Sequence, residues 1–174
     1  MSQITLGILG GGQLGSMLSI AAKKLNIRTV IYSDDKEAPA QNFCDEFIFG
    51  DYSNKEKILE FVKKVDVITY EFENIPFETL NGMNKLKSVL PKPSVNRLIQ
   101  HRLAEKDFIN KLNIRTTRYV SIEKKSDIET LEDFLPGILK TTTMGYDGKG
   151  QYPIKKIEDL DTIDIDFSKG YILE

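Results

Sequence analysis

The sequence predicts an α/β protein with a parallel sheet, because strand-like and helix-like segments alternate along its first hundred residues. Strands separated by helices favour a parallel sheet with helices on both faces. A run of glycines follows the first strand-like segment directly and opens a helix-like segment, as in doubly wound folds. A proline-rich connector then precedes a region of different composition. We therefore predict two domains, residues 1–93 and 94–174.

Apolar spacing predicts the elements of the first domain in order. A short β-rich run from Ile4 to Leu9 is the first strand. Apolar residues recur every three or four positions from Gln13 to Leu25, which indicates an amphipathic helix. A second helix spans Ile58 to Val62, with Asn54 as its expected cap. The other strands are expected at residues 28–32, 47–49 and 65–70.

The second domain begins at a stiff connector, Leu90-Pro91-Lys92-Pro93-Ser94, since proline fixes its own φ and restricts the residue before it. Ser94 is expected to cap a helix that runs through Leu98, and a second helix follows at Arg102 to Leu112. The remaining elements are a strand near Tyr119, a helix from Ser126 to about Leu135 and a buried strand from Gly137 to Lys140.

Composition excludes several classes of protein. Apolar residues make up 40% of the chain and charged residues 29%, which is ordinary for a soluble globular protein. A net charge of −2 gives no electrostatic reason to expect a nucleic-acid partner. The single cysteine, Cys44, excludes an internal disulfide, suits a reducing compartment and is expected to be buried. With no basic leader and no apolar run near the ~18 residues of a membrane span, we expect a cytoplasmic protein.

The last residues, Gly170 to Glu174, have the pattern of an apolar strand with no turn, cap or polar tail after it. A strand that stopped there would leave an unpaired edge. We therefore expect the sequence to be cut from a longer protein.

The first glycine motif, Gly10-Gly11-Gly12-Gln13-Leu14-Gly15, has G-x-G-x-x-G spacing between a strand and a helix. In this context a phosphate can sit on the helix N-terminus. Asp34 follows about 20 residues later, where a dinucleotide site places a ribose-binding acid. The motif therefore favours a nicotinamide or flavin nucleotide, although any doubly wound fold needs glycine at this turn for close packing.

Acidic residues close the fourth strand in the segment Tyr70-Glu71-Phe72-Glu73-Asn74-Ile75-Pro76. Strand alternation would place Glu71 and Glu73 on one face at the sheet edge where ligands bind. Two crowded carboxylates repel, so the arrangement suits hydroxyls or a cation between them. A polar sugar or an amine would use this cluster. The alternative is that both side chains simply face water.

A second glycine motif, Gly145-Tyr146-Asp147-Gly148-Lys149-Gly150-Gln151, follows the strand that ends at Lys140. Its three glycines allow the backbone N–H groups to approach a ligand closely. Lys149 and Lys140 add point charges that suit phosphate. The alternative is an ordinary β-hairpin, since Asp147-Gly148 is a common turn.

Other catalytic signatures are not found. His101 is the only histidine, and a lone helix histidine is more often inert than catalytic. The sequence offers no Ser/His/Asp or Cys/His set and no zinc-ligand spacing.

Taken together, three motifs resemble the ATP-grasp family, and within it the ligases that carboxylate 5-aminoimidazole ribonucleotide in purine biosynthesis. They are the glycine motif at residues 10–15, the acidic segment at 70–76, and Lys140 with the hairpin at 145–151. The resemblance covers essentially all 174 residues. It implies a Rossmann-like preATP-grasp domain with a parallel sheet, followed by the first part of an ATP-grasp α+β domain.

The resemblance also implies an activity. Such ligases use ATP to phosphorylate bicarbonate, and the amine of 5-aminoimidazole ribonucleotide captures the carboxyl group, which gives N5-carboxyaminoimidazole ribonucleotide, ADP and phosphate. They use Mg²⁺ and are generally homodimers. The metal ligands are expected beyond residue 174, so we expect no turnover by this chain alone. Two alternatives stay open, an NAD-dependent oxidoreductase and a non-catalytic nucleotide-binding module.

The resemblance assigns roles residue by residue. Tyr146 and Asp147 are implied as catalytic residues that also reach the ribonucleotide. ATP would be bound by Arg102, Lys140, Gly145, Tyr146, Asp147, Gly148, Lys149, Gly150, Gln151 and Glu174. The ribonucleotide would be bound by Gly12, Gln13, Leu14 and Glu73. The chain departs from the family at Ser16, where arginine is common, and at Thr142-Thr143-Met144, where Arg-Arg-Gly is common.

Overall fold

The computed structural model describes residues 3–145 and 148–174. It divides the chain into two compact units, Met1–Arg97 and Leu98–Glu174. No helix within those two described ranges is long and apolar enough to cross a membrane.

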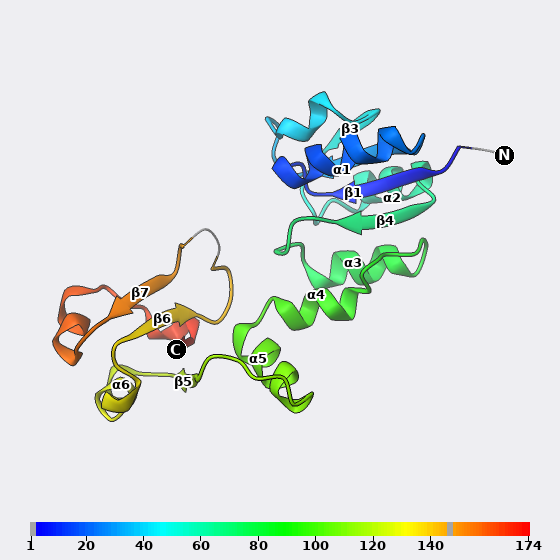
Figure 1. The fold of residues 1–174 in the computed structure, drawn as a ribbon. Helices are drawn as coiled ribbons and strands as arrows, with labels where there is room; N and C mark the ends of the chain where they lie inside the picture. Colours follow the sequence, from blue (N-terminus) through cyan, green and yellow to red (C-terminus); the bar gives the residue numbers. More distant parts are fainter. Residues whose placement is uncertain (1–2, 146–147) are drawn as a thin grey trace. The chain divides into compact units, whose positions relative to one another are not determined.

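The first unit is built on a four-stranded parallel sheet in the order β3-β2-β1-β4 (Figure 1). The parallel sheet predicted from the sequence is therefore confirmed. In this order the carboxyl ends of β1 and β4 lie side by side, with Leu9 opposite Tyr70. The strands are β1 (Thr5–Leu9), β2 (Arg28–Ser33), β3 (Glu46–Phe49) and β4 (Val67–Tyr70).

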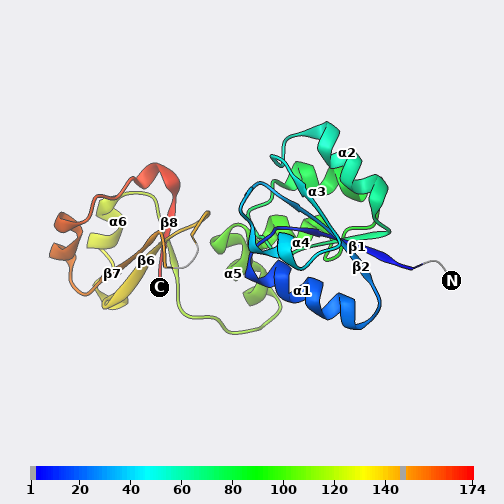
Figure 2. The same ribbon diagram turned by 90° about the horizontal axis from the view of Figure 1, so that it is seen from above.

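Helices cover both faces of this sheet, as predicted. The helix α1 (Gln13–Lys24) lies on one face, and α2 (Lys55–Lys64) and α3 (Phe77–Asn84) lie on the other (Figure 2). Asn54 caps α2 as expected, since its side chain accepts a hydrogen bond from the Lys57 N–H at 3.1 Å. The sequence reasoning missed α3.

Alternation along the strands divides the core into two layers. The layer under α2 and α3 includes the fully buried side chains Leu9, Tyr32, Phe61 and Leu80. The layer on the opposite face joins Ile8 and Ile31 to Ala40 of a short 3-10 helix, η1 (Pro39–Asn42). Cys44 packs against this second layer but is only half-buried, so the expectation of a buried thiol is wrong in degree.

The helix α1 packs on the sheet through the face opposite to the one that its apolar pattern predicts. The side chains of Leu14, Met17 and Leu18 are 57%, 57% and 38% exposed. The residues that α1 buries are the small ones, Gly15, Ser16, Ser19 and Ala22. Small side chains let α1 approach the sheet and η1 closely, so its apolar stripe faces away from this unit's core.

The helix at the proline connector begins earlier than expected. It is α4 (Pro93–Ile99), so Ser94 lies inside the helix and does not cap it. Proline suits the first helical position because its φ is already helical and its missing N–H would have no partner there. Asn96 of α4 is fully buried and donates to the Ile75 carbonyl at 3.2 Å.

The second unit contains an antiparallel sheet in the order β5-β8-β6-β7. Its strands are β5 (Val120–Ile122), β6 (Gly137–Thr141), β7 (Gln151–Ile154) and β8 (Tyr171–Leu173). The strand β8 pairs with β5 on one side and β6 on the other. The argument that this strand would leave an unpaired edge is therefore wrong.

The second unit also contains several helices. They are α5 (Arg102–Lys111), α6 (Lys125–Glu129) and the 3-10 helices η2 (Glu132–Phe134), η3 (Ile157–Thr162) and η4 (Phe167–Lys169). The helix predicted from Ser126 to about Leu135 is wrong in length, because α6 ends at Glu129. There the Thr130 hydroxyl donates to the Asp127 carbonyl at 2.9 Å, a local bond that competes with helix continuation.

Candidate functional site

The first glycine motif forms a tight loop between β1 and α1. Gly10 has φ +102°, and its N–H donates to the Tyr32 carbonyl at 2.9 Å. A Cβ atom at Gly10 would lie 2.6 Å from the Oε1 atom of Glu71. Glycine is therefore required here both for the backbone conformation and for the close approach of a carboxylate.

Glu71 holds this loop. Its Oε1 atom accepts a hydrogen bond from the Gly12 N–H at 2.9 Å, and its own N–H donates to the Leu9 carbonyl at 3.0 Å. The strand β4 ends at Tyr70, so strand alternation does not govern the acidic segment and the prediction based on it is wrong. Glu71 is half-buried against the loop, whereas Glu73 is exposed.

This arrangement argues against a dinucleotide site. In a dinucleotide fold the loop N–H groups and the helix N-terminus receive a pyrophosphate. Here the Gly12 N–H already donates to Glu71, and the carboxylate would repel a second anion at the same place. The geometry therefore disfavours the oxidoreductase alternative, although Asp34 does lie beside the loop.

A pocket of about 290 Å³ opens at this edge of the sheet. It is lined by Gly10, Gly11, Gly12, Ser33, Asp34, Asp35, Tyr52, Glu71 and Phe72. Tyr52 is 5% exposed, and its hydroxyl lies beside the backbone N–H of Asp34. Burial, and then the negative charges of Asp34 and Glu71, raise the pKa of Tyr52 well above its ordinary value. The phenol is therefore neutral and able to donate a hydrogen bond.

The other predicted residues of this loop begin α1. Gln13 and Leu14 are exposed in the first helical turn, where backbone N–H groups have no acceptor within the helix. Ser16, the position where the family commonly has arginine, is buried, and its hydroxyl donates to the Gly12 carbonyl at 3.1 Å. Ser16 therefore stabilises the loop and offers no charge to a ligand.

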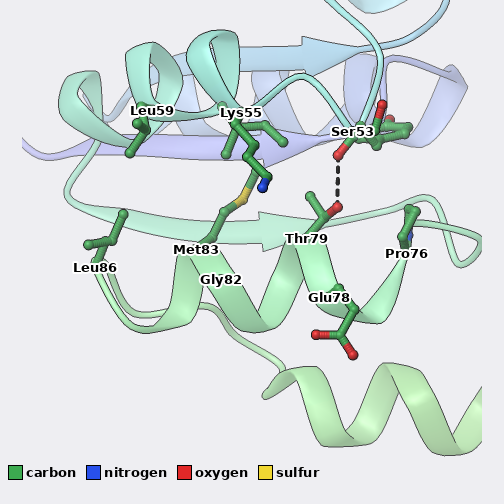
Figure 3. Close-up of a pocket in the computed structure, with 11 residues that line it drawn as sticks. Ser53, Lys55, Leu59, Pro76, Glu78, Thr79, Gly82, Met83 and Leu86 are labelled. Carbon is green, nitrogen blue, oxygen red and sulfur yellow. Dashed lines mark hydrogen bonds between the residues drawn. The ribbon is translucent and has the colours of Figure 1, made fainter.

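A larger cavity of about 500 Å³ lies between α2 and α3 (Figure 3). Its walls include Lys55, Leu59 and Met83, and the Thr79 hydroxyl in it already donates to the Tyr52 carbonyl at 2.7 Å. The lining is mostly apolar. It lacks the clustered polar groups that a phosphate or a sugar needs.

The second glycine motif belongs to the β6–β7 hairpin of the other unit. Lys140 of β6 lies opposite Gln151 of β7, and the Thr141 N–H donates to the Gly150 carbonyl at 2.9 Å. Gly148 and Gly150 have φ of +78° and +68°, which confirms that glycine is needed in this turn. Tyr146 and Asp147, the predicted catalytic residues, lie outside the described residues.

Arg102, the first residue of α5, forms hydrogen bonds with the base of this hairpin. Its Nε atom donates to the Thr141 carbonyl at 3.1 Å, and a terminal guanidinium nitrogen donates to the Gly145 carbonyl at 3.0 Å. Its backbone N–H donates to the Thr142 carbonyl at 2.8 Å. Arg102 is thus brought beside Gly145. His101, the only histidine, caps α5 by accepting the Ala104 N–H at 3.4 Å.

Met144 has a backbone conformation that is more usual for glycine. It has φ +58°, in the left-handed region that glycine adopts without cost. The resemblance implies glycine at this position, and glycine would adopt this conformation more easily than methionine. Thr142 is buried, and its hydroxyl donates to the Lys169 carbonyl at 3.2 Å.

Two lysines converge on Glu174. Lys140 lies 3.1 Å from its Oε1 atom and Lys106 of α5 lies 3.1 Å from its Oε2 atom. The three side chains are only 19%, 16% and 10% exposed for Lys140, Lys106 and Glu174. Sequence reasoning found Lys140 and Glu174 but missed Lys106, because no local pattern links α5 to β8. The cluster keeps one excess positive charge.

The pKa of Glu174 predicts an acid-sensitive contribution to stability. Burial raises it, but the hydrogen bonds and charges of Lys106 and Lys140 outweigh burial and lower it below the ordinary value. A carboxyl with a depressed pKa stabilises the fold above the unfolded value of about 4.3, and this is lost as the pH falls through the folded pKa. In urea unfolding, we expect Glu174→Gln to be less stable than wild type at pH 7.

This difference should shrink below about pH 4, where the unpaired carboxyl of the unfolded chain is protonated. Glu158→Gln, at an exposed position of η3, is the matched control and should follow wild type at every pH. A gap between Glu174→Gln and wild type that stays constant from pH 7 to pH 3 would contradict the ion-pair assignment.

Metal binding is not supported by these side chains. Among the residues that the structure describes, no group of three His, Cys, Asp or Glu side chains could hold a metal ion.

Known proteins show similarity over both units. The family model described as the ribonucleotide synthetase preATP-grasp domain matches residues 3–100, and the ATP-grasp domain model matches residues 107–174. The chain is 37% identical over 175 residues to an N5-carboxyaminoimidazole ribonucleotide synthase of Aquifex aeolicus, which covers 98% of this chain and 46% of the relative. It is 40% identical over 159 residues to the bifunctional purine synthesis protein purC/E of Dictyostelium discoideum, covering 90% and 16%.

A solved structure agrees with this similarity. N5-carboxyaminoimidazole synthetase from Staphylococcus aureus complexed with ADP matches with a TM-score of 0.88 and 31% identity. The match covers 99% of this chain and 48% of that one. The chain thus spans less than half the length of these relatives.

Proposed function

We infer, since this chain belongs to the ribonucleotide synthetase preATP-grasp family, that it forms part of an ATP-dependent carbon–nitrogen ligase. The proposed reaction is the carboxylation of 5-aminoimidazole ribonucleotide by bicarbonate, which yields N5-carboxyaminoimidazole ribonucleotide, ADP and phosphate. The observation that carries the proposal is the glycine hairpin anchored by Arg102 beside Lys140, in the same chain as a glycine loop closed by Glu71. An oxidoreductase needs neither the hairpin nor the carboxylate at the loop.

We place ATP at the hairpin of the second unit. Lys140 would neutralise phosphate oxygens, and Arg102 would hold the hairpin at the edge of the site. The full set proposed to bind ATP is Arg102, Lys140, Gly145, Tyr146, Asp147, Gly148, Lys149, Gly150, Gln151 and Glu174. The excess positive charge of the Lys106–Glu174–Lys140 cluster supports binding of an anion here.

The ribonucleotide is assigned to the first unit. Gly12, Gln13 and Leu14 at the start of α1, together with Glu73, would bind it. The first turn of a helix leaves free N–H groups, so the backbone at Gln13 and Leu14 can donate hydrogen bonds to the ribonucleotide. We propose residues 1–93 as this substrate-binding domain and residues 94–174 as the start of the ATP-binding domain.

The chemistry requires activation of bicarbonate by phosphoryl transfer and capture of the carboxyl group by the substrate amine. Such a reaction depends mainly on positioning, charge neutralisation and exclusion of water. Lys140 would supply charge, and the glycine hairpin would supply a cover over the phosphates, with Tyr146 and Asp147 proposed as catalytic residues. We propose, as the resemblance to the family implies, that the ligands for Mg²⁺ come from elsewhere in the protein.

Location and assembly follow from the same proposal. A soluble purine-biosynthetic ligase would act in the cytoplasm, and the single cysteine suits a reducing compartment. We propose a homodimer for the whole protein.

A thermal-shift panel on this chain tests the function. We expect stabilisation by 5-aminoimidazole ribonucleotide or by Mg-ATP and none by NADH, because bound ligand stabilises the folded state by mass action. Stabilisation by NADH alone would overturn the proposal. In the same preparation, bicarbonate-dependent release of ADP should be absent. Phosphoryl transfer needs Mg²⁺ held in place by protein ligands, and these are proposed to come from elsewhere in the protein. Robust release would contradict the proposed source of the metal ligands.

A further inference from the structure

The carboxylate of Glu174 is shared by two lysines, each on its own oxygen. Lys140 pairs with Oε1 and Lys106 pairs with Oε2, both at 3.1 Å. The backbone of Glu174 is fixed as well, because its N–H donates to the Ile138 carbonyl at 3.1 Å and its carbonyl accepts the Ile138 N–H at 2.6 Å. Since the two lysines do not compete for one oxygen, one can leave while the other stays.

The two lysines are not held equally. The Nζ atom of Lys106 also lies over the ring of Tyr119, 5.3 Å from its centroid, in a cation–π contact. That ring is fixed in turn, because the Tyr119 hydroxyl donates to Asp107 of α5 at 2.6 Å. In the described part of the chain, Glu174 is the only ion-pair partner of Lys140. Lys140 is therefore the lysine that an incoming anion can take.

The position of Lys140 suits such a transfer. It lies opposite Gln151, the first residue of β7, and so beside the turn of the glycine hairpin. Lys106 follows Arg102 by four residues on α5, and residues at this spacing share a helix face. One face of α5 thus provides Arg102 to the base of the hairpin and Lys106 to Glu174.

The burial of Glu174 explains why a second cation is needed. Its side chain is only 10% exposed. An ionised carboxylate at such a site costs much free energy when its partner is removed. A phosphate could therefore draw Lys140 away only if another cation stayed on Glu174, and Lys106 is placed to be that cation.

We propose that Lys106 is a positioning residue for ATP, which holds Glu174 while Lys140 moves to the phosphates. This inference rests on the proposed function, which places ATP at the hairpin. Charge is balanced on both sides of the movement, because one cation stays with the carboxylate and the other neutralises a phosphate oxygen. Glu174 would contribute to ATP binding through the two lysines, since each of its oxygens is already paired with one of them.

Lys106→Met tests the proposal, because it removes the charge and keeps an unbranched side chain. Lys140 would then be the only partner of Glu174, and ATP could take it only by leaving the carboxylate unpaired. We expect Mg-ATP to bind about tenfold more weakly, the effect of one charge-assisted hydrogen bond. The affinity for 5-aminoimidazole ribonucleotide should stay within about twofold of wild type. Calorimetric titration measures both affinities, at a temperature where the melting curve shows each variant to be folded.

The double variant Lys106→Met and Glu174→Gln separates positioning from packing. With no carboxylate to hold it, Lys140 can reach the phosphates, so the affinity for Mg-ATP should return to within about twofold of wild type. A loss caused by poorer packing of α5 would persist, because removing a second charge repairs no packing. Lys111→Met is the matched control, since Lys111 is exposed at the end of the same helix and its loss should leave the affinity for Mg-ATP unchanged.

Lys106→Met that binds Mg-ATP as tightly as wild type would overturn this inference and leave the proposed function standing. A double variant that binds as weakly as Lys106→Met would overturn it too. If Lys106→Met does not fold, Lys106→Arg takes its place, because it keeps a cation on Glu174 and should bind Mg-ATP within about twofold of wild type. A tenfold loss in Lys106→Arg would contradict the inference. A wild-type chain that does not bind Mg-ATP at all would instead overturn the placement of ATP at the hairpin.

Discussion

Lys140→Ala is expected to weaken ATP binding by about ten- to a hundredfold, the effect of losing one charge-assisted contact to a phosphate. The affinity for 5-aminoimidazole ribonucleotide should stay within about twofold, because Lys140 belongs to the second unit's hairpin. Lys106 would still pair with Glu174, so the carboxylate is not left without a partner. Titration of each ligand separately against the variant measures both effects.

Lys125→Ala is the matched control for this variant. Lys125 lies in the same unit and pairs with Asp161, but both side chains are largely exposed. Replacing Lys125 with alanine removes the same charge from the unit. It should change neither the affinity for ATP nor the affinity for the ribonucleotide. Equal losses for ATP and the ribonucleotide in Lys140→Ala would show that Lys140 is wrongly assigned to the phosphate site.

Phe61→Ala should lower the free energy of unfolding by about 3–5 kcal/mol, as expected for removing a large side chain from a packed core. Phe61 is fully buried on α2 and meets Tyr32 edge-on, with 5.7 Å between the ring centroids. It also lies against the backbone of β1, since a Cβ atom at Gly7 would approach its Cζ atom to 2.7 Å.

Urea unfolding of the variant measures this loss. Phe43→Ala makes the same change at a side chain that is 46% exposed and should cost less than about 1 kcal/mol. If both variants lost the same free energy, Phe61 would not be the contact that holds α2 on the sheet.

Much of the first unit follows from the sequence because its signals are local. The strand Thr5–Leu9, the Asn54 cap and the glycine loop each depend on residues close together in the chain. The face of α1 that packs on the sheet cannot be predicted in this way. Helical periodicity shows that Leu14, Met17 and Leu18 share a stripe, but not which side of the helix meets the sheet. Gly15, Ser16 and Ser19 decide that, since they allow the closer approach.

The candidate sites also combine features that local sequence predicts with features that depend on residues far apart in the chain. The glycines at positions 10, 148 and 150 are identifiable because their backbone needs positive φ. The bond from Gly12 to Glu71 joins segments far apart in the sequence, and the end of β4 at Tyr70 frees Glu71 to make it. Lys106 was missed for a related reason, because its ion pair depends on a tertiary neighbour, Glu174.

The central place of β8 also bears on how the second unit folds. β5 and β6 both pair with β8, and not with each other, yet β8 follows them in the chain. During synthesis the β6–β7 hairpin can form from local contacts as soon as it emerges. β5 must wait, with its apolar side chains uncovered, until Tyr171–Leu173 arrives between the two strands. Such a step closes a long loop before it gains contacts, which makes it slow and exposes the chain to misassociation.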